Sequence, residues 1–314
     1  MNMKAEPMVS ISTMSKNLEG IITDGFNSWL AQKTNFNYNI VLSDDCSTDN
    51  TVEVVKNIQQ KHPDKIIVLT SDKPLGLGKN WIRSMQACTG KYIAFCDGDD
   101  LWTDPLKLQK QIDYMEQNPN CNLICADYDY LSENGEYIVS EWKQEWYGKK
   151  FDILENLENA IATTLTTVIR KSALDPLLKS ISLDKHPFIW DSFLWAFTLQ
   201  KGYGFFYPEK LALRRVQASG IYTTKSALGR AEYDFGAIQS IKAYIKDERV
   251  QAHVNNSLYS LNITVAQEYF KMGNNKTGRK HLLKSAVKWN GISSLATNIK
   301  YIYWFIKSLL FKLT

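Results

Sequence analysis

Short apolar runs alternate with amphipathic stretches through the first half of the chain. The apolar runs predict buried strands over residues 9–13, 39–43, 66–70 and 92–96. Helical spacing of apolar residues, or a helix-starting signal, predicts helices over 20–32, 51–61 and 79–87 and from Asp104-Pro105 onward. Strands that are apolar on both faces and alternate with helices are typical of a mostly parallel sheet covered by helices. The pattern therefore predicts an α/β fold.

The pattern changes in the second half of the chain. Residues 123–147 are aromatic and read as extended. Further along, helices are expected over 175–179 and 191–200, and short strands over 205–207 and 211–215. Beyond about residue 220 the strand signals stop and several helices follow. We therefore expect a first domain over 1–220 and a C-terminal helical region over 221–314.

Composition narrows the class of protein. The chain has 314 residues, of which 44% are apolar and 22% charged, so it can bury a full core and is not a disordered protein. Its five cysteines form no C-x-x-C pair and its four histidines are scattered, which argues against a disulfide framework and a zinc site. No apolar run reaches the ~18 residues of a spanning helix. These features predict a cytoplasmic protein.

The net charge of +4 hides two opposite parts. Residues 1–220 carry 23 basic and 28 acidic side chains, whereas residues 221–314 carry 14 and 5, with no acidic residue after Glu268. The total is too small to predict a nucleic-acid partner. The apolar, aromatic stretch 301–311 follows this basic region. It either lies as an amphipathic helix on an anionic membrane surface, which predicts peripheral attachment to the inner face, or packs on neighbouring helices.

Acidic side chains follow two of the predicted strands. Asp44-Asp45 ends the second strand, and Asp97-Gly98-Asp99-Asp100 ends the fourth. Ligands of open α/β sheets bind beyond the carboxyl ends of the strands, so both segments are expected at one edge. Three carboxylates within four residues suit a hard divalent cation, with Gly98 allowing a phosphate to approach. The alternative is a solvated acidic turn that caps the next helix.

Two neighbouring segments add polar groups to this edge. Asp44 or Asp45 can accept a hydrogen bond from a base imino group or a ribose hydroxyl, while the residues that follow, 47–49, suit helix capping. The segment 76–80 contains two glycines but matches neither a dinucleotide fingerprint nor a P-loop. It is read as a turn before a helix. Lys79 then lies near a phosphate or ribose, or is simply a solvated lysine.

Taken together, these segments resemble the family 2 glycosyltransferases, the large inverting group with the GT-A fold. The resemblance covers roughly residues 8–220. It rests on the order and spacing of VSIST, NIVLSDDCSTD, LGLGKN, TGKYIAFCDGDDLW, DPLKL, Trp190-Asp191 and Arg214-Arg215-Val216-Gln217. It implies a Rossmann-like nucleotide-sugar transferase domain followed by a C-terminal helical extension.

The resemblance also implies which residues bind the donor, a nucleoside diphosphate sugar. Thr13 ends the first strand, where the family lines its nucleotide pocket. Asp45, helped by Asp44, would hold the base, and Lys79 would lie near the ribose or the phosphates. One departure affects this part of the site: the first loop reads Thr-Met-Ser-Lys-Asn, where relatives often have Pro-x-Tyr-Asn.

The resemblance implies a metal and a catalytic base as well. Asp97-Gly98-Asp99 looks like the family's D-x-D motif, in which Asp99 would contact Mn²⁺ or Mg²⁺ and Asp97 or Asp100 would help to bind metal or ribose. Asp191 matches the usual acidic base; without the resemblance, the residue reads more readily as a helix cap. Many relatives carry a histidine where this chain has Gln217, so we expect at most a hydrogen bond there.

The function implied is a metal-dependent inverting glycosyltransferase. It would move a sugar from a nucleotide-sugar donor, expected to be UDP-linked, to a hydroxyl of a glycan or a lipid-linked glycan in envelope polysaccharide assembly. Two alternatives stay open at this point. One is nucleotidyl transfer, which uses the same metal–phosphate chemistry, and the other is a non-catalytic scaffold that binds nucleotide sugars.

Overall fold

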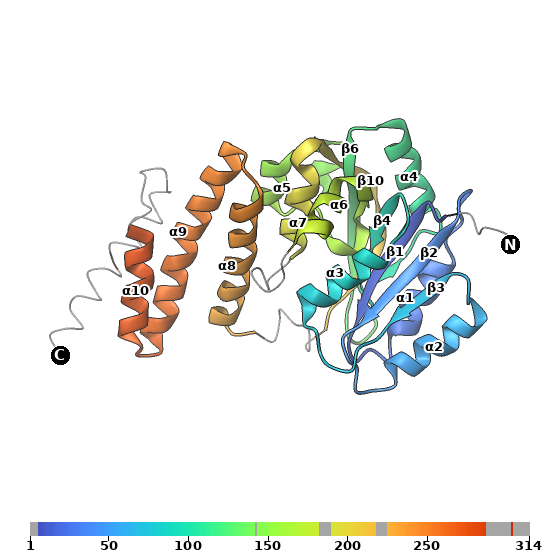
Figure 1. Cartoon of the computed structure of the whole chain (residues 1–314), viewed down its shortest axis with the longest axis horizontal. Helices are drawn as coiled ribbons and strands as arrows, with labels where there is room; N and C mark the ends of the chain where they lie inside the picture. Colours follow the sequence, from blue (N-terminus) through green and yellow to red (C-terminus); the bar gives the residue numbers. More distant parts are fainter. Residues whose placement is uncertain (1–5, 142, 182–189, 218–224, 287–302, 304–314) are drawn as a thin grey trace. The chain divides into compact units, whose positions relative to one another are not determined.

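The computed structural model describes residues 6–141, 143–181, 190–217, 225–286 and 303. The chain divides into two compact units, residues 1–217 and 218–314. The first unit contains a sheet with helices, and the second contains long helices (Figure 1).

The described part of the first unit forms a ten-stranded mixed sheet. From one edge to the other its strands are β3 (Ile66–Leu69), β2 (Tyr38–Asp44), β1 (Val9–Ser15), β4 (Tyr92–Phe95), β9 (Val168–Arg170), β6 (Cys121–Leu131), β10 (Tyr203–Arg215) and β5 (Leu101–Trp102). Two short strands are added at the side: β7 (Tyr137–Ile138) pairs with β6, and β8 (Lys150–Phe151) pairs with β10. Strands β3, β2, β1 and β4 are parallel, whereas β9 runs antiparallel to β4 and β6.

Helices connect these strands. They are α1 (Ile22–Leu30), α2 (Thr51–Lys61), α3 (Leu77–Ala87), α4 (Lys107–Gln117), α5 (Ile153–Asn159), α6 (Lys171–Ser180) and α7 (Asp191–Thr198), with single 3₁₀ turns η1 (Gln144–Trp146), η2 (Thr164–Thr166) and η3 (Leu199–Lys201). A strand–helix alternation of this kind confirms the predicted α/β class.

The core lies on both faces of the sheet because successive strand side chains point to opposite sides. On one face, Phe26 and Trp29 of α1 pack with Ala94 of β4 and Leu108 of α4. On the other, Phe95 meets two tryptophans in edge-to-face contacts: its ring centroid lies 5.9 Å from that of Trp81 in α3 and 5.1 Å from that of Trp195 in α7. Burial of both faces explains why these strands are apolar throughout.

Most predicted elements appear within two residues of their expected ends. The main error concerns residues 205–207 and 211–215, which were expected as two strands and form the single strand β10. Its pairing with β6 shifts register between Tyr207 and Lys210, around Pro208. Proline has no amide hydrogen to donate to the ladder, so the sheet accommodates it with an irregularity while the strand continues.

The described part of the second unit is helical. It contains α8 (Ala227–Tyr244), α9 (Glu248–Lys271) and α10 (Asn275–Ala286). α10 packs on α9 through Leu282, which joins a small core with Tyr259, Ile263 and Phe270. Over the described residues, every helix is too short or too polar to cross a bilayer. The stretch 301–311, predicted to reach a membrane surface, lies outside the described residues except for Tyr303.

Candidate active site

Both acidic segments are attached to the end of β1. This strand lies between β2 and β4 and is parallel to each. The amide of Asp45 donates a hydrogen bond to the carbonyl of Ser15 at 2.9 Å, and the amide of Gly98 donates one to the carbonyl of Met14, also at 2.9 Å. The sheet therefore brings the segments 44–45 and 97–100 to one edge, as the strand pattern predicts.

Gly98 is packed too tightly for any side chain. A Cβ atom at this position would lie 2.7 Å from the carbonyl oxygen of Met14 and 2.7 Å from Cδ1 of Ile22. Contacts this short are not seen for real Cβ atoms, so the strand and helix α1 would have to move. The glycine lets the acidic loop pack directly against the end of β1. This contact fixes the position of the backbone that carries Asp97 and Asp99.

Two of the three carboxylates in this loop are held by the last residue of β10 and by the chain just after it. The amide of Arg215 donates to Oδ1 of the buried Asp100 at 2.9 Å, and Nε2 of Gln217 donates to Oδ2 of Asp99 at 2.9 Å. The side-chain amide of Gln217 therefore holds a carboxylate of the acidic loop. No hydrogen bond to the carboxylate of Asp97 is found among the described residues. The loop and the end of β10 thus form one structure in which Asp97 keeps its acceptor capacity.

Negative charge accumulates in this loop. Burial raises the pKa of Asp97 to about 7, and the charges of Asp99 and Asp191 add to the shift. Burial also raises the pKa of Asp99 and raises that of Asp100 well above its usual range, the latter helped by Asp99 and Asp97. The guanidinium of Arg214 opposes all three shifts. Arg215 also opposes the shift of Asp99, but burial still keeps all three pKa values raised, so the edge favours a bound cation.

The donor atoms fit a hard divalent cation. Carboxylate oxygens are the ligands that Mg²⁺ and Mn²⁺ prefer. Asp97, whose carboxylate accepts no hydrogen bond from the described residues, is separated from Asp99 by Gly98 alone. Within the described ranges, no three acidic, histidine or cysteine side chains are grouped as a complete metal site. A cation here would therefore need further oxygen ligands from water or substrate, which is usual for Mg²⁺.

Asp191 lies close enough to this acidic loop to act on it electrostatically. It is the first residue of α7, where its Oδ1 accepts a hydrogen bond from the amide of Ser192 at 2.6 Å and its Oδ2 faces Thr164 Oγ1 at 3.4 Å. Burial raises its pKa, against the opposing effect of these contacts and of the cations of Arg214 and Lys143. Asp191 thus begins α7 and also adds its negative charge to that of the loop 97–100.

The sequence reasoning missed the polar residues around Asp191. Lys143 is 2% exposed, and its ammonium donates to the carbonyls of Ala160 and Ile161. Burial lowers its pKa, while Cys125, Asp127 and Asp191 counteract that effect. Asp127, on β6, accepts a hydrogen bond from the phenol of Tyr147 at 2.9 Å. These residues come from distant parts of the chain, and no motif marks them.

Asp44 is fully engaged by its own surroundings. Its Oδ1 accepts hydrogen bonds from the hydroxyls of Ser15 at 2.8 Å and Ser47 at 2.5 Å, and its Oδ2 accepts one from the amide of Ser47 at 2.8 Å. The side chain is 1% exposed. In this structure Asp44 therefore fixes the turn after β2, and the remaining acceptor capacity at this strand end belongs to its neighbour Asp45.

Asp45 joins three loops. Its Oδ1 accepts hydrogen bonds from the amides of Leu75 and Gly76 at 2.6 and 3.1 Å, and its Oδ2 lies 3.3 Å from the ammonium of Lys16. Gly76 has φ of +79°, a backbone conformation that favours glycine, and it immediately precedes α3. Lys79, in the first turn of that helix, is exposed. Asp45 thus positions the loop that leads to Lys79.

Thr13 has an unusual environment for a threonine. It lies in β1 and is 1% exposed, and its buried hydroxyl oxygen has no hydrogen-bond partner among the residues that the structure describes. A buried hydroxyl without a partner costs free energy, so such groups are few in folded proteins. This one lies two residues before the strand end at which the acidic segments meet.

The match to a family model decides which family contains this site. The model described as Glycosyl transferase family 2 matches residues 10–178, more than half of the chain. The chain belongs to glycosyltransferase family 2. The matched range includes every predicted donor and metal residue, and Asp191 lies beyond it.

Sequence relatives agree with this family. The chain is 28% identical over 218 residues to the uncharacterized protein Rv1520 of Mycobacterium tuberculosis, an alignment that covers 68% of this chain and 60% of the relative. The chain therefore spans less than two thirds of that protein. It is 27% identical over 190 residues to the Escherichia coli UDP-Glc:alpha-D-GlcNAc-diphosphoundecaprenol beta-1,3-glucosyltransferase WfgD, covering 60% of this chain and 70% of the relative.

Solved structures show the same fold at low identity. Staphylococcus aureus TarS in complex with UDP-GlcNAc superposes with a TM-score of 0.64 and 16% identity over 89% of this chain and 81% of that one. The mannosyltransferase PcManGT of Pyrobaculum calidifontis, in complex with GDP-Man and Mn²⁺, has a TM-score of 0.58 and 14% identity, covering 98% and 81%. These similarities confirm the GT-A architecture of a family 2 glycosyltransferase.

Proposed function

We propose that this protein is a metal-dependent inverting glycosyltransferase. It transfers one sugar from a UDP-linked donor to a hydroxyl of a glycan or lipid-linked glycan used in envelope polysaccharide assembly. The observation that carries the proposal is geometric: hydrogen bonds attach the segments 44–45 and 97–100 to the end of β1. Beside this, burial and then the charges of Asp99 and Asp191 raise the pKa of Asp97 in the loop after β4. A carboxylate able to take a proton thus lies near the carboxylates that suit a metal-bound diphosphate.

Asp191 is the proposed general base. The acceptor hydroxyl gives its proton to the carboxylate of Asp191 as its oxygen forms a bond to the anomeric carbon. The bond from that carbon to the diphosphate oxygen breaks on the opposite face, which inverts the configuration and releases the nucleoside diphosphate. Burial raises the pKa of Asp191, and a carboxylate with a raised pKa is a stronger base.

Asp45 and Thr13 are the proposed contacts of the nucleotide. Oδ2 of Asp45 has Lys16 as its partner at 3.3 Å, a loose contact that leaves room for a hydrogen bond from the base. The buried, unpartnered hydroxyl of Thr13 would gain its missing hydrogen bond from the same ligand. Asp44 holds the turn beneath them, and the exposed Lys79 is assigned to the ribose or the phosphates.

Asp97 and Asp99 are the proposed protein ligands of Mn²⁺ or Mg²⁺, and Asp100 supports the loop from its buried position. When bound, the metal would stabilise the charge that develops on the departing diphosphate. The hydrogen bond from Gln217 orients the carboxylate of Asp99. The Mn²⁺ in the PcManGT complex supports this proposal.

The nature of the donor and acceptor is inferred from relatives. WfgD is named as a transferase that uses UDP-Glc and a diphosphoundecaprenol-linked acceptor, and TarS was solved with UDP-GlcNAc. These support a UDP-linked donor and a lipid-linked acceptor for this chain. We also propose that the protein works at the inner face of the cell membrane, with its C-terminal stretch at the surface. Deletion of residues 296–314 should then abolish co-sedimentation with anionic liposomes.

The test of the base is a comparison of two aspartates at helix starts. Asp191→Asn should lower the rate of transfer by about 100-fold or more, since general base catalysis typically contributes 10²–10⁴-fold. Asp152→Asn is the matched control, because Asp152 caps α5 by accepting from the amide of Glu155. Asparagine is also a good cap, so this control should keep full activity. Release of nucleoside diphosphate from the donor is the measurement.

Three results would overturn the proposal. Full transfer by Asp191→Asn would mean that this carboxylate only starts the helix. Release of pyrophosphate in place of nucleoside diphosphate would show nucleotidyl transfer. Donor binding without turnover, for every acceptor offered, would show a nucleotide-sugar-binding scaffold.

A further inference from the structure

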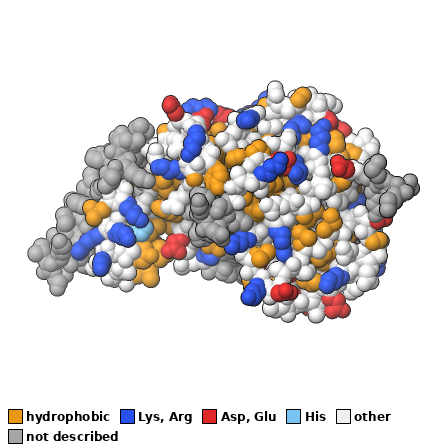
Figure 2. Space-filling model, viewed as in Figure 1, with side chains coloured by type: hydrophobic (Ala, Val, Ile, Leu, Met, Phe, Trp, Pro, Cys, Tyr) orange, Lys and Arg blue, Asp and Glu red, His pale blue; other side chains and the backbone are white. Residues whose placement is uncertain are grey.

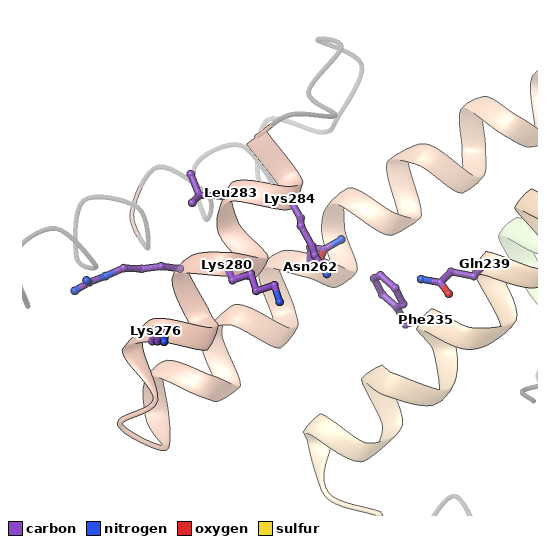
Figure 3. A pocket seen from close by; sticks show the side chains of 8 residues that line it. Phe235, Gln239, Asn262, Lys276, Lys280, Leu283 and Lys284 are labelled. Atoms are coloured by element: carbon purple, nitrogen blue, oxygen red, sulfur yellow. The ribbon is translucent and has the colours of Figure 1, made fainter.

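A pocket lies among α8, α9 and α10, the helices in the described part of the second unit. Its volume is about 860 Å³, within the range of ligand sites in proteins. Figure 3 shows Lys280 extending from α10 towards α8, from which Phe235 and Gln239 point back, while Lys284 lies near Asn262 of α9. The pocket therefore has a basic side, an aromatic ring and two amide groups.

The basic side comes from one face of α10. Lys276, Arg279, Lys280 and Lys284 line the pocket at spacings of three and four residues, which places them along one side of a helix. Figure 2 shows Lys and Arg side chains gathered over this helix. No carboxylate lines the pocket, and none of these four cations has an ion-pair partner among the described residues. Like charges this close repel one another unless an anion binds between them.

His281 attaches α10 to α9, which holds this basic face in place. Nδ1 of His281 donates a hydrogen bond to Oδ1 of Asn262 at 3.0 Å, and its ring stacks on that of Tyr269 with 5.8 Å between the ring centroids. Burial lowers the pKa of His281, and the charges of Lys284 and Lys280 lower it further. The positive charges of Lys280 and Lys284 thus disfavour protonation of His281 on the same helix.

We propose that this pocket binds the phosphate groups of an anionic ligand that carries an apolar or aromatic part. The ammonium and guanidinium groups of α10 would bind the phosphate oxygens, and the amide group of Gln239 adds a donor. Phe235 offers a face for the remainder of the ligand, and the volume exceeds what a single phosphate needs. The described residues that line the pocket all belong to the second unit, and the inference does not depend on the proposed transfer reaction.

The same chemistry can come from a soluble diphosphate or from an anionic lipid headgroup, and the experiment separates the two. The full-length protein is titrated with inorganic pyrophosphate by calorimetry in EDTA, so that metal-dependent binding at the acidic edge is absent. In parallel it is sedimented with phosphatidylglycerol vesicles and with phosphatidylcholine vesicles. The variant is Lys280→Gln with Lys284→Gln.

The matched control removes the same charge elsewhere. Lys56 and Lys61 are exposed on α2, and the control variant is Lys56→Gln with Lys61→Gln. We expect the pocket variant to bind roughly tenfold or more weakly, because it loses two charge-assisted contacts, while the control keeps wild-type affinity. The variant Lys280→Arg with Lys284→Arg keeps both charges and should retain binding.

Each outcome is decisive. Weaker pyrophosphate binding by the pocket variant supports a soluble diphosphate ligand, and a loss confined to phosphatidylglycerol vesicles supports a lipid headgroup. Equal binding by the pocket variant and the α2 control, in both arms, overturns the proposal. Because donor binding in the presence of Mn²⁺ is measured on the same variants, failure of this inference is distinguishable from failure of the proposed transferase function.

Discussion

The acidic edge of the first unit and the basic face of α10 concentrate opposite charge by different means. At the acidic edge the carboxylates come from separate loops, and hydrogen bonds from Arg215 and Gln217 hold Asp100 and Asp99 in place. On α10 the cations come from one helix at regular spacing and make no ion pairs with the described residues. The acidic edge forms only when the sheet brings separate loops together, whereas the basic face follows from the spacing of residues within one helix.

The difference also concerns burial. The carboxylates of Asp97, Asp99 and Asp100 have pKa values raised by removal from water, which is costly unless a cation binds them. The cations of α10 line an open pocket, so most of their hydration remains until a ligand arrives. We therefore expect tight, metal-dependent binding at the acidic edge and weaker, salt-sensitive binding at the pocket.

The largest expected effect comes from removing the metal or its proposed ligand. EDTA, or Asp99→Asn, should weaken donor binding by at least about 100-fold, since a bound cation contributes several kcal/mol at a diphosphate. Neither should change pyrophosphate binding at the α10 pocket. Calorimetry with the donor, with and without Mn²⁺, measures the effect.

Asp72→Asn is the control for this prediction, because Asp72 is exposed in the loop before α3 and the same charge is removed. Equal donor affinity for Asp99→Asn and wild-type protein would break the proposed distinction between the two regions.

A smaller effect is expected from closing the space at Gly98. Gly98→Ala forces a methyl group against Met14 and Ile22, which should cost about 1–3 kcal/mol of stability and lower Tm by roughly 3–8 °C. Gly20→Ala is the control, since no atom lies within 4 Å of the added Cβ. Calorimetric melting compares them. A Tm for Gly98→Ala equal to that of the control would show that the loop adjusts freely.

The smallest expected effect concerns Gln217. Gln217→Ala removes the hydrogen bond to Asp99 and should weaken Mn²⁺-dependent donor binding roughly threefold to tenfold. Gln217→Glu places a further negative charge there and should weaken binding without metal more than binding with it. Unchanged affinity for both variants, measured by the same titration, would mean that Asp99 is oriented by other contacts.

Strand periodicity predicted the meeting of the acidic segments because parallel strands leave their carboxyl ends at one edge. The periodicity does not predict that the carboxylate of Asp44 accepts hydrogen bonds from Ser15 and Ser47, because Ser15 lies 29 residues away in the chain. For the same reason, Lys143 and Thr164 beside Asp191 carry no sequence signal. Contacts between distant loops are set by the packed fold.

The second unit shows the reverse. The sequence shows a basic region with no acidic residue after Glu268. Four of its cations recur at helical spacing, which predicts that they share one helix face: Lys276, Arg279, Lys280 and Lys284. What the sequence could not supply was the other wall of the pocket, because Phe235 comes from α8. A charged helix face becomes a candidate site only when its neighbours are known.

The most direct test of the account is the configuration of the product formed from the donor. Nuclear magnetic resonance can follow a UDP-linked α-sugar with Mn²⁺, with the donor chosen by a thermal-shift screen of nucleotide sugars. The account predicts release of UDP and a first-formed product in the β configuration, at a rate that Asp191→Asn lowers about 100-fold or more. A first-formed α product, release of pyrophosphate, or an unchanged rate for Asp191→Asn would contradict it.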